Sequence, residues 1–130
     1  MTRINAGIPV EELCDAHILA EHREITRIPN SIKSGKVKIK DIPENFKLGT
    51  GHVKFFYNKL LYLKKRYILL HTICKRKKFK VENKISSFDD LPEELMNDWT
   101  PEQNSIDIVR QRINERLSKM KNVKYTEIED

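Results

Sequence analysis

The chain has 130 residues, of which 38% are hydrophobic and 34% are charged, and its 25 lysines and arginines outnumber its 19 aspartates and glutamates to give a net charge of +6. This length fits one ordinary domain with a real core, so we expect a single domain over residues 1–130. No run of about 18 apolar residues could cross a membrane, and residues 1–9 lack the apolar stretch and cleavage site of a signal peptide. The composition therefore argues against membrane and secreted classes and predicts a soluble, intracellular protein.

The first predicted helix begins near Val10, directly behind Pro9, and extends to about Arg27. Three- and four-residue spacing places on one of its faces Leu13, Ala16, His17, Ala20 and Glu24. We expect Pro29 to bend or end this helix, because proline disfavours helical angles in the residue before it.

Residues 36–51 alternate only loosely between apolar and basic side chains and include one proline and two glycines, which predicts an irregular basic connection. The clearest helical pattern follows, over 53–74. Its apolar stripe comprises Val53, Phe56, Leu60, Leu63, Tyr67, Leu70 and Cys74. Four basic residues fall outside that stripe: Lys59, Lys64, Lys65 and Arg66. The pattern predicts a core helix with a basic outer face.

Two parts of this helix have both a structural and a nucleic-acid interpretation. The aromatic residues 55–57 could stack on bases, but aromatics at helical spacing more often pack in a core, and we expect core packing here. The basic run 75–78 fits a nucleic-acid arm and a solvated helix end equally well.

The third predicted helix has Thr100 as its N-cap and Pro101 in its first turn, and it should end near Lys121. Its apolar positions are Ile106, Val109, Ile113, Leu117 and Met120. Residues 79–99 predict a loop with a short helical turn. Together these patterns predict an all-α fold, a compact single domain of three main helices with long connecting loops.

The sequence contains none of the common cofactor-binding or metal-binding motifs. The four glycines form neither a GxGxxG motif nor a phosphate-binding loop. His17 and His22 are five residues apart and so on different helix faces, while His71 and Cys74 form a single pair that is too small for a zinc site. Cys14 and Cys74 are expected to be free thiols. We therefore expect no metal and no cofactor.

The excess positive charge makes nucleic acid a natural partner, although charge also serves solubility. The first helix contains a dense ionisable cluster: His17, Glu21, His22, Arg23, Glu24 and Arg27. Arg23 and Arg27 are four residues apart and flank Glu24, so one surface can hold two phosphate-binding guanidiniums beside a carboxylate. Spacing alone favours an ordinary solvated face over an active site.

Several short motifs follow one another along the chain. They are MTRIN at 1–5, AEHRE at 20–24, GHVKFFY at 51–57 with Lys59 and Leu60, and LKKR at 63–66, followed more loosely by LPE at 91–93 and by Arg112 and Glu115 in the third helix. Over nearly its whole length the chain resembles the phage pyrimidine-dimer DNA glycosylase/AP lyase family, of the bacteriophage endonuclease V type.

This resemblance implies a compact helical enzyme that needs no metal or cofactor, kinks damaged double-stranded DNA and displaces a base from the stack. It implies that the α-amino group of Thr2, exposed when Met1 is removed, attacks the sugar C1′, that an imine forms, and that β-elimination then cleaves the strand. Glu24 matches the essential carboxylate. The positions that match the DNA contacts of the family are Arg3, His17, Arg23, Arg27, Arg112 and Arg116.

The expected partner is thus damaged duplex DNA, with a cyclobutane pyrimidine dimer as the lesion. We expect a monomer with no obligate protein partner, acting in the cytoplasm of a phage-infected or bacterial cell. The chain departs from the family at Ala16, where a glutamine contact is usual, in a shorter 29–49 region, and in a reduced tail, Val123–Tyr125, before the acidic residues Glu127, Glu129 and Asp130. In the family, the loop and the tail bind the damaged DNA, so these departures affect which lesion the protein recognises. The alternative is a non-catalytic or altered-specificity DNA-binding relative.

Overall fold

The computed structural model describes residues 2–129, and helices are the only regular secondary structure in that range. In chain order these are the 3-10 helix η1 (Val10–Glu12), α1 (Asp15–Glu24), α2 (Arg27–Lys33), α3 (His52–Phe55), the 3-10 helix η2 (Phe56–Asn58), α4 (Leu60–Arg76), the 3-10 helices η3 (Ile85–Phe88) and η4 (Glu93–Leu95), and α5 (Gln103–Leu117). The all-α fold class is therefore confirmed. None of these helices combines the length and the apolar character needed to cross a membrane.

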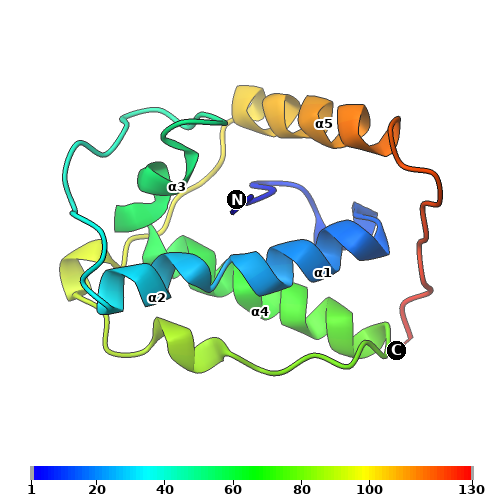
Figure 1. Ribbon diagram of the computed structural model, residues 1–130, viewed down its shortest axis with the longest axis horizontal. Coiled ribbons are helices and arrows are strands. Elements are labelled where there is room, and N and C mark those ends of the chain that lie inside the picture. Colours follow the sequence, from blue (N-terminus) through cyan, green and yellow to red (C-terminus); the bar gives the residue numbers. More distant parts are fainter. Residues whose placement is uncertain (1, 130) are drawn as a thin grey trace.

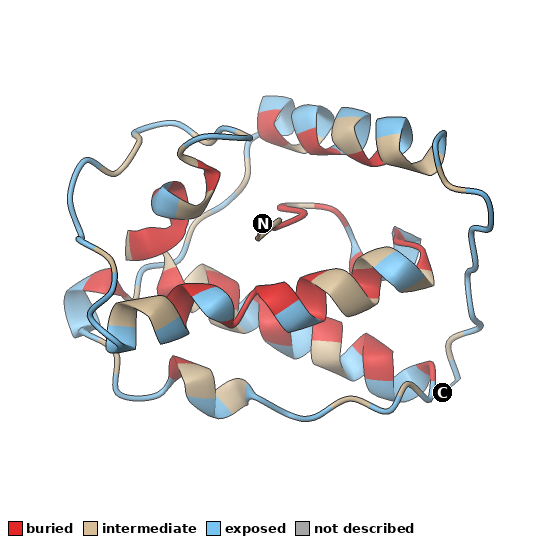
Figure 2. Cartoon of the chain, in the orientation of Figure 1, coloured by how far each residue is buried: buried red, intermediate tan, exposed pale blue. Residues whose placement is uncertain are grey.

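The helices surround an N-terminal segment that has no regular structure (Figure 1). The helices α1 and α2 follow one another across the molecule; α1 packs on α4 and α2 packs on η2 and η3, while α5 lies on the other side of the N-terminal segment. Figure 2 shows buried residues along α4 and along the N-terminal segment. Ile4, Leu63 and Leu70 are fully buried. The core thus forms around the first residues of the chain.

The predicted first helix is two elements, because the chain is extended at Leu13 and Cys14 between η1 and α1. Both side chains are buried at this break, so two successive apolar residues enter the core, which one helix face does not allow. Ala16, which helical spacing placed on the same face as Leu13, is exposed. The residues that α1 and its C-cap bury are Ile18, Glu21, His22, Glu24 and Ile25.

Pro29 does not end a helix, which was one of its two predicted effects, and the helix is instead interrupted just before it, at residues 25–26. α1 has already ended at Glu24, and Pro29 is the third residue of α2. Proline is tolerated in a first turn, because the N–H that it lacks would have no partner inside the helix. α2 ends at Lys33, and Gly35 directly beyond its C-cap has a φ of +74°.

The predicted helix over 53–74 is interrupted at Lys59, whose φ of −129° and ψ of 42° are not helical. The Lys59 ammonium donates to the carbonyl of Phe55 over 3.0 Å and to Asn58 Oδ1 over 2.9 Å, so it satisfies acceptors where the preceding turns end. From Leu60 to Cys74 the predicted stripe is buried as expected. The aromatic residues 55–57 are also buried, which confirms core packing.

The third helix begins at Gln103, not at Pro101, because Glu102 has extended angles and is the N-cap. It ends at Leu117, four residues before the predicted end, where the chain tightens into a turn in which Lys119 N donates to Arg116 O. The loops at 36–51 and 79–99 are irregular as predicted, with η3 and η4 as short turns in the second.

The basic run 75–78 does not act as one unit. Lys77 is buried and its ammonium donates to Asp15 Oδ1 over 3.0 Å, whereas Lys78 is exposed. Asp15 also accepts from the backbone N–H and the hydroxyl of Thr126. The segment before the C-terminus is thereby fastened to the beginning of α1 and the end of α4. Both described cysteines are free, as predicted, and both are buried.

Candidate active site

The N-terminal segment 2–8 forms no helix or strand, so its backbone groups do not pair in regular secondary structure. Side chains of other elements bind them instead. Arg3 N donates to Glu24 Oε1 over 3.1 Å, and Ile4 N donates to His52 Nε2 over 3.0 Å. Ile4 is fully buried. Buried backbone groups must find partners, so these side chains fix the path of the segment through the interior.

Further along, the same segment is fixed from α4. Gly7 N donates to the hydroxyl of Tyr62 over 3.2 Å, and Arg66 Nη1 donates to the carbonyl of Ile8 over 2.5 Å. Gly7 has a φ of +76°, and a Cβ at this position would lie 2.5 Å from Cγ1 of Ile106 on α5. Only glycine fits this close passage between α4 and α5.

Glu24 is the last residue of α1 and its carboxylate faces the start of the chain. The residue is 8% exposed, Oε1 accepts from Arg3 N, and Oε2 lies 3.7 Å from Arg23 Nη2. Standard bond lengths place successive backbone nitrogens at most about 3.7 Å apart, so the nitrogen of Thr2 lies within roughly 7 Å of this carboxylate. A buried carboxylate therefore adjoins the first residues of the chain.

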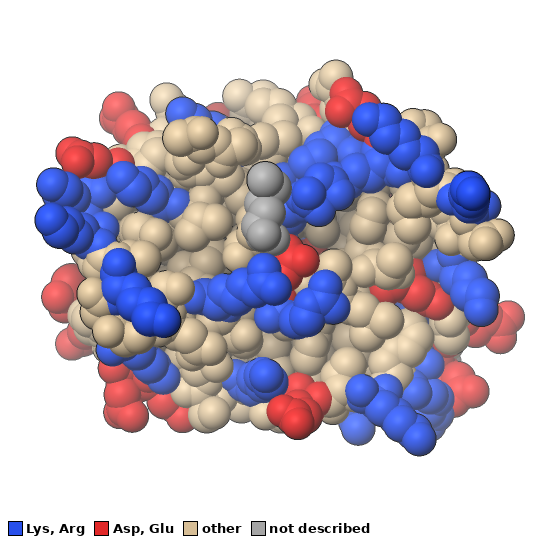
Figure 3. Space-filling view, viewed as in Figure 1, with Lys and Arg blue, Asp and Glu red and all other residues tan. Residues whose placement is uncertain are grey.

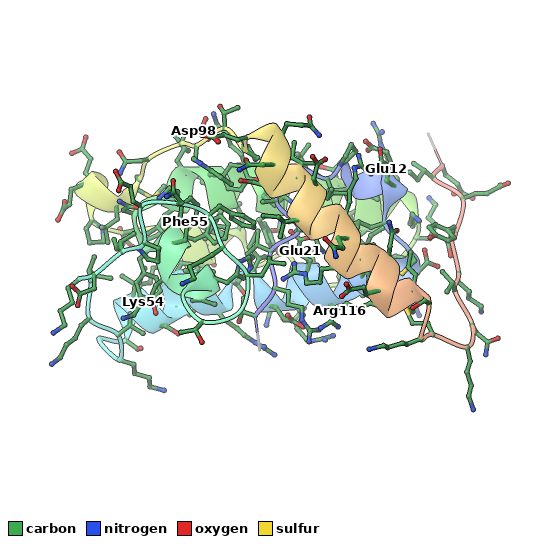
Figure 4. The ribbon with its side chains drawn as sticks, turned by 90° about the horizontal axis from the view of Figure 1, so that it is seen from above. Glu12, Glu21, Lys54, Phe55, Asp98 and Arg116 are labelled. Carbon is green, nitrogen blue, oxygen red and sulfur yellow. The ribbon has the colours of Figure 1, made fainter. Side chains whose placement is uncertain are left out.

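A small pocket opens beside Glu24, between α1 and α5. Its lining includes Arg3, His17, Glu24, Arg112 and Arg116, and its volume of about 30 Å³ suits a group the size of a water molecule. Figure 3 shows lysines and arginines gathered over α1 and α5 on both sides of the N-terminal segment. In Figure 4 Arg116 lies toward the side where this segment emerges, whereas Glu12 and Asp98 lie on the other side.

Two arginines of this pocket, Arg112 and Arg116, have lowered pKa values. Burial, followed by the positive charges of Arg116 and Arg3, lowers the pKa of Arg112 to about 10. Arg112 Nη2 donates to Asn5 Oδ1 over 3.1 Å and to the carbonyl of Ile4 over 3.4 Å. Arg112 therefore stabilises the N-terminal segment while it holds a positive charge at the pocket.

The surroundings of His17 favour its neutral form, because its pKa is lowered. Burial, and then the positive charges of Arg116, Arg112 and Arg3, lower its pKa below the ordinary value of 6.5. Its Nδ1 is buried and has no hydrogen-bond partner among the described residues. A neutral imidazole with a free ring nitrogen can bind a ligand that enters this pocket.

Of the eight residues predicted for the site, five line this pocket, namely Arg3, His17, Glu24, Arg112 and Arg116, and Thr2 adjoins Arg3. The other two are not part of the lining. Arg23 is exposed at the end of α1, and Arg27 is the exposed first residue of α2. The removal of Met1 concerns a residue outside the described range.

Sequence reasoning missed an ion pair that supports the site. Glu21 was expected on a solvated face and Arg66 outside the apolar stripe, but their side chains are 1% and 5% exposed. Arg66 donates to Glu21 through Nε over 2.8 Å and through Nη2 over 3.0 Å, and Asn5 Nδ2 donates to Glu21 Oε1 over 3.0 Å. A signal existed, because Arg66 lies three residues after Leu63 and Glu21 three after Ile18.

A larger groove of about 590 Å³ lies elsewhere, between residues 7–11, α4 and residues 98–101. Its walls are mainly apolar, with Ile8, Leu69 and Trp99 among them. It does not include Arg3, Arg112 or Arg116, which line the small pocket. The electrostatics of phosphate binding therefore favour the small pocket over the large groove. Within residues 2–129, no three histidine, cysteine, aspartate or glutamate side chains are grouped so that they could hold a metal ion.

One comparison with known families bears on this geometry. Residues 1–87 match a family model described as pyrimidine dimer DNA glycosylase. The match covers two thirds of the chain and includes Thr2, Arg3, His17 and Glu24, whereas α5 lies outside it.

Proposed function

Because the chain belongs to the pyrimidine dimer DNA glycosylase family, we propose that it excises a base of a pyrimidine dimer with the α-amine of Thr2 and then cleaves the strand as an AP lyase. The observation that supports this mechanism best is the hydrogen bond of 3.1 Å from Arg3 N to the buried carboxylate of Glu24. It brings the first residues of the chain beside a group that can move protons.

The nucleophile requires loss of Met1. An α-amine titrates at about 7.7 to 8.0, against about 10.4 for lysine, so a useful fraction is neutral at cellular pH. The adjacent guanidinium of Arg3 favours the neutral form further, because like charges disfavour one another. The lone pair of the amine forms a bond to the sugar C1′, while the glycosidic bond breaks and the base departs with that electron pair and gains a proton.

The second step follows from the first. The nitrogen then loses one proton, the bond from C1′ to the ring oxygen breaks, and that oxygen takes up a proton. A protonated imine remains, which acidifies the C2′ proton. Removal of that proton expels the 3′ phosphate by β-elimination. Glu24 stabilises the cationic sugar and transfers protons between these steps, a role that its position beside Arg3 supports.

The basic residues bind the DNA in this proposal. Arg3, Arg112 and Arg116 meet at the pocket, and Arg23 and Arg27 extend the positive surface toward α2. Guanidinium groups form bidentate hydrogen bonds with phosphates, and such contacts position a duplex without reading its sequence. His17, held neutral, supplies a hydrogen-bonding group among these charges. We propose that the protein acts as a monomer, inside the cell, and without an obligate protein partner.

The direct test is borohydride trapping. The purified protein, with loss of Met1 verified by mass spectrometry, is incubated with a duplex that carries a thymine dimer and with one that carries an abasic site. We expect a covalent protein–DNA adduct with both substrates. An adduct with the abasic duplex alone would contradict the glycosylase step for this lesion. DNA binding that salt weakens, with no adduct on either duplex, would favour the alternative of a binding relative.

A further inference from the structure

His52 anchors the N-terminal segment one residue beyond its contact with Glu24. It is the first residue of α3 and is 3% exposed. Its Nε2 lies 3.0 Å from Ile4 N, and its Nδ1 lies 2.9 Å from the carbonyl oxygen of Lys47. The imidazole thus joins the 36–51 loop to the first residues of the chain.

These two contacts determine the protonation of the ring. A carbonyl oxygen only accepts, so Nδ1 must carry the hydrogen that it donates to Lys47. The backbone N–H of Ile4 only donates, so Nε2 must be unprotonated in order to accept it. Only the neutral Nδ1–H form makes both bonds. Burial is the main cause that lowers the pKa of His52 to about 4, although the bond to Lys47 opposes the shift.

The ring is also fixed by packing. Phe46 and Phe56 meet it edge to face, each with its ring centroid 5.5 Å from that of His52. A side chain held by two hydrogen bonds and two aromatic rings has little freedom to move, so Nε2 is a fixed acceptor.

We propose that His52 is a positioning residue, whose fixed acceptor holds the N-terminal segment so that the amine of Thr2 meets the sugar beside Glu24. This inference rests on the proposed function. Successive amides of the segment bind to two different elements, Arg3 N to α1 through Glu24 and Ile4 N to α3 through His52. Without the second bond, Glu24 would be the one side chain that still accepts from these two amides, while Arg112 would hold the carbonyl of Ile4 from the other side.

The position of a nucleophile matters to its rate, because a displacement of 1 Å can cost about 100-fold. His52→Phe keeps a ring of similar size but removes the acceptor. His52→Gln keeps an amide oxygen near the place of Nε2. As a matched control, His22→Phe alters a histidine that is 7% exposed and whose hydrogen bond and ring contacts are with His71 and Tyr67 of α4.

The readout is the single-turnover rate of borohydride-trapped adduct on an abasic duplex, together with DNA affinity, at a temperature where every variant is folded by circular dichroism. We expect His52→Phe to slow trapping by roughly 10- to 100-fold with affinity changed less than about threefold. His52→Gln should recover most of the rate, and His22→Phe should keep it. A wild-type rate in His52→Phe, or a Gln variant as slow as the Phe variant, would overturn the proposal.

A second measurement does not depend on activity or on variants. Nitrogen-15 NMR of the wild-type protein should show the Nδ1–H tautomer of His52 and a coupling across the bond from Ile4 N–H to Nε2. The opposite tautomer, or absence of that coupling, would refute the anchor. Failure of the wild-type protein to form any adduct would instead refute the proposed function, so the two failures can be told apart.

Discussion

Glu21 of α1 and Arg66 of α4 form a buried ion pair, joined by hydrogen bonds of 2.8 and 3.0 Å. Burial acts against the charged guanidinium, but the carboxylate of Glu21 outweighs it and raises the pKa of Arg66. Arg66 also donates to Ile8 and Glu21 accepts from Asn5, so the pair links both helices to the N-terminal segment.

Replacing Arg66 with methionine should destabilise the fold strongly. The substitution keeps an unbranched chain but leaves Glu21 as an uncompensated buried charge, and loss of one partner from a buried pair costs about 3–5 kcal/mol. Urea unfolding at pH 7 measures this loss. The neighbouring Lys65→Met variant is the control, because Lys65 pairs with Asp98 where both side chains are exposed and should contribute at most about 1 kcal/mol. Equal losses in the two variants would contradict a stabilising role for the buried pair.

That pair also shows where sequence reasoning is limited. Helical spacing correctly placed Leu60, Leu63 and Leu70 in the core, because each side chain is apolar and buries area independently of its partners. A charged residue enters a core only when its partner does, and the partner of Arg66 lies 45 residues away. Helical spacing puts Arg66 beside Leu63, but it does not say which residue on another helix neutralises its charge, so the charges were assigned to solvent.

Glu24→Gln should suppress catalysis while it leaves DNA binding nearly intact. The amide oxygen can still accept from Arg3 N, so the geometry of the segment survives, but the group can no longer exchange protons or stabilise a cation as an anion. We expect single-turnover base release and strand cleavage to fall at least about 100-fold. Gel-shift affinity for the dimer duplex provides the comparison, and normal turnover in this variant would remove Glu24 from the mechanism.

Two arginines of α5 should differ in their effect on DNA binding. Arg116 lines the pocket, whereas Arg110 is exposed and donates to Glu12 over 2.7 Å. Arg116→Gln should weaken binding and lower the slope of log affinity against log salt by about 0.9, as expected for the loss of one phosphate contact. Arg110→Gln should leave both quantities unchanged. Fluorescence anisotropy over a range of salt concentrations measures them, and similar slopes in the two variants would place the DNA elsewhere.

Stability should decline as the pH falls below 6.5. The pKa of His52 is about 4 in the folded protein and 6.5 is its ordinary value, so folding favours the neutral ring. That contribution is complete above pH 6.5 and is lost as the pH falls toward 4, amounting to about 2 kcal/mol between pH 7.5 and 5. Urea unfolding at both pH values tests this, and His52→Gln should lose less stability over the interval than the wild type. His17 and His22 shift in the same direction, so some decline should remain.

The site itself was only partly predictable. Arg3, His17, Glu24, Arg112 and Arg116 were identified through a resemblance, and they meet in one pocket. His52 was part of a recognised motif, but its role depends on a bond to Ile4, 48 residues away. An irregular segment has no periodicity, so nothing in its own sequence indicates which side chains bind its backbone.

The most decisive prediction concerns the nitrogen of Thr2 and not its hydroxyl. Thr2→Ala keeps a small second residue, so Met1 should still be removed and the free amine should retain its rate within about threefold, since a side chain outside the reaction contributes little. Thr2→Leu should retain Met1 and move the free amine by one residue, about 3.8 Å along the chain, away from Glu24. We expect adduct formation to fall at least about 100-fold in that variant, and equally after selective acetylation of the wild-type amine. Mass spectrometry establishes the first residue of each sample, and trapping on the abasic duplex gives the rates. A slow Thr2→Ala variant that has lost Met1 would assign the chemistry to the side chain, whereas a fast acetylated protein would place the nucleophile on another residue.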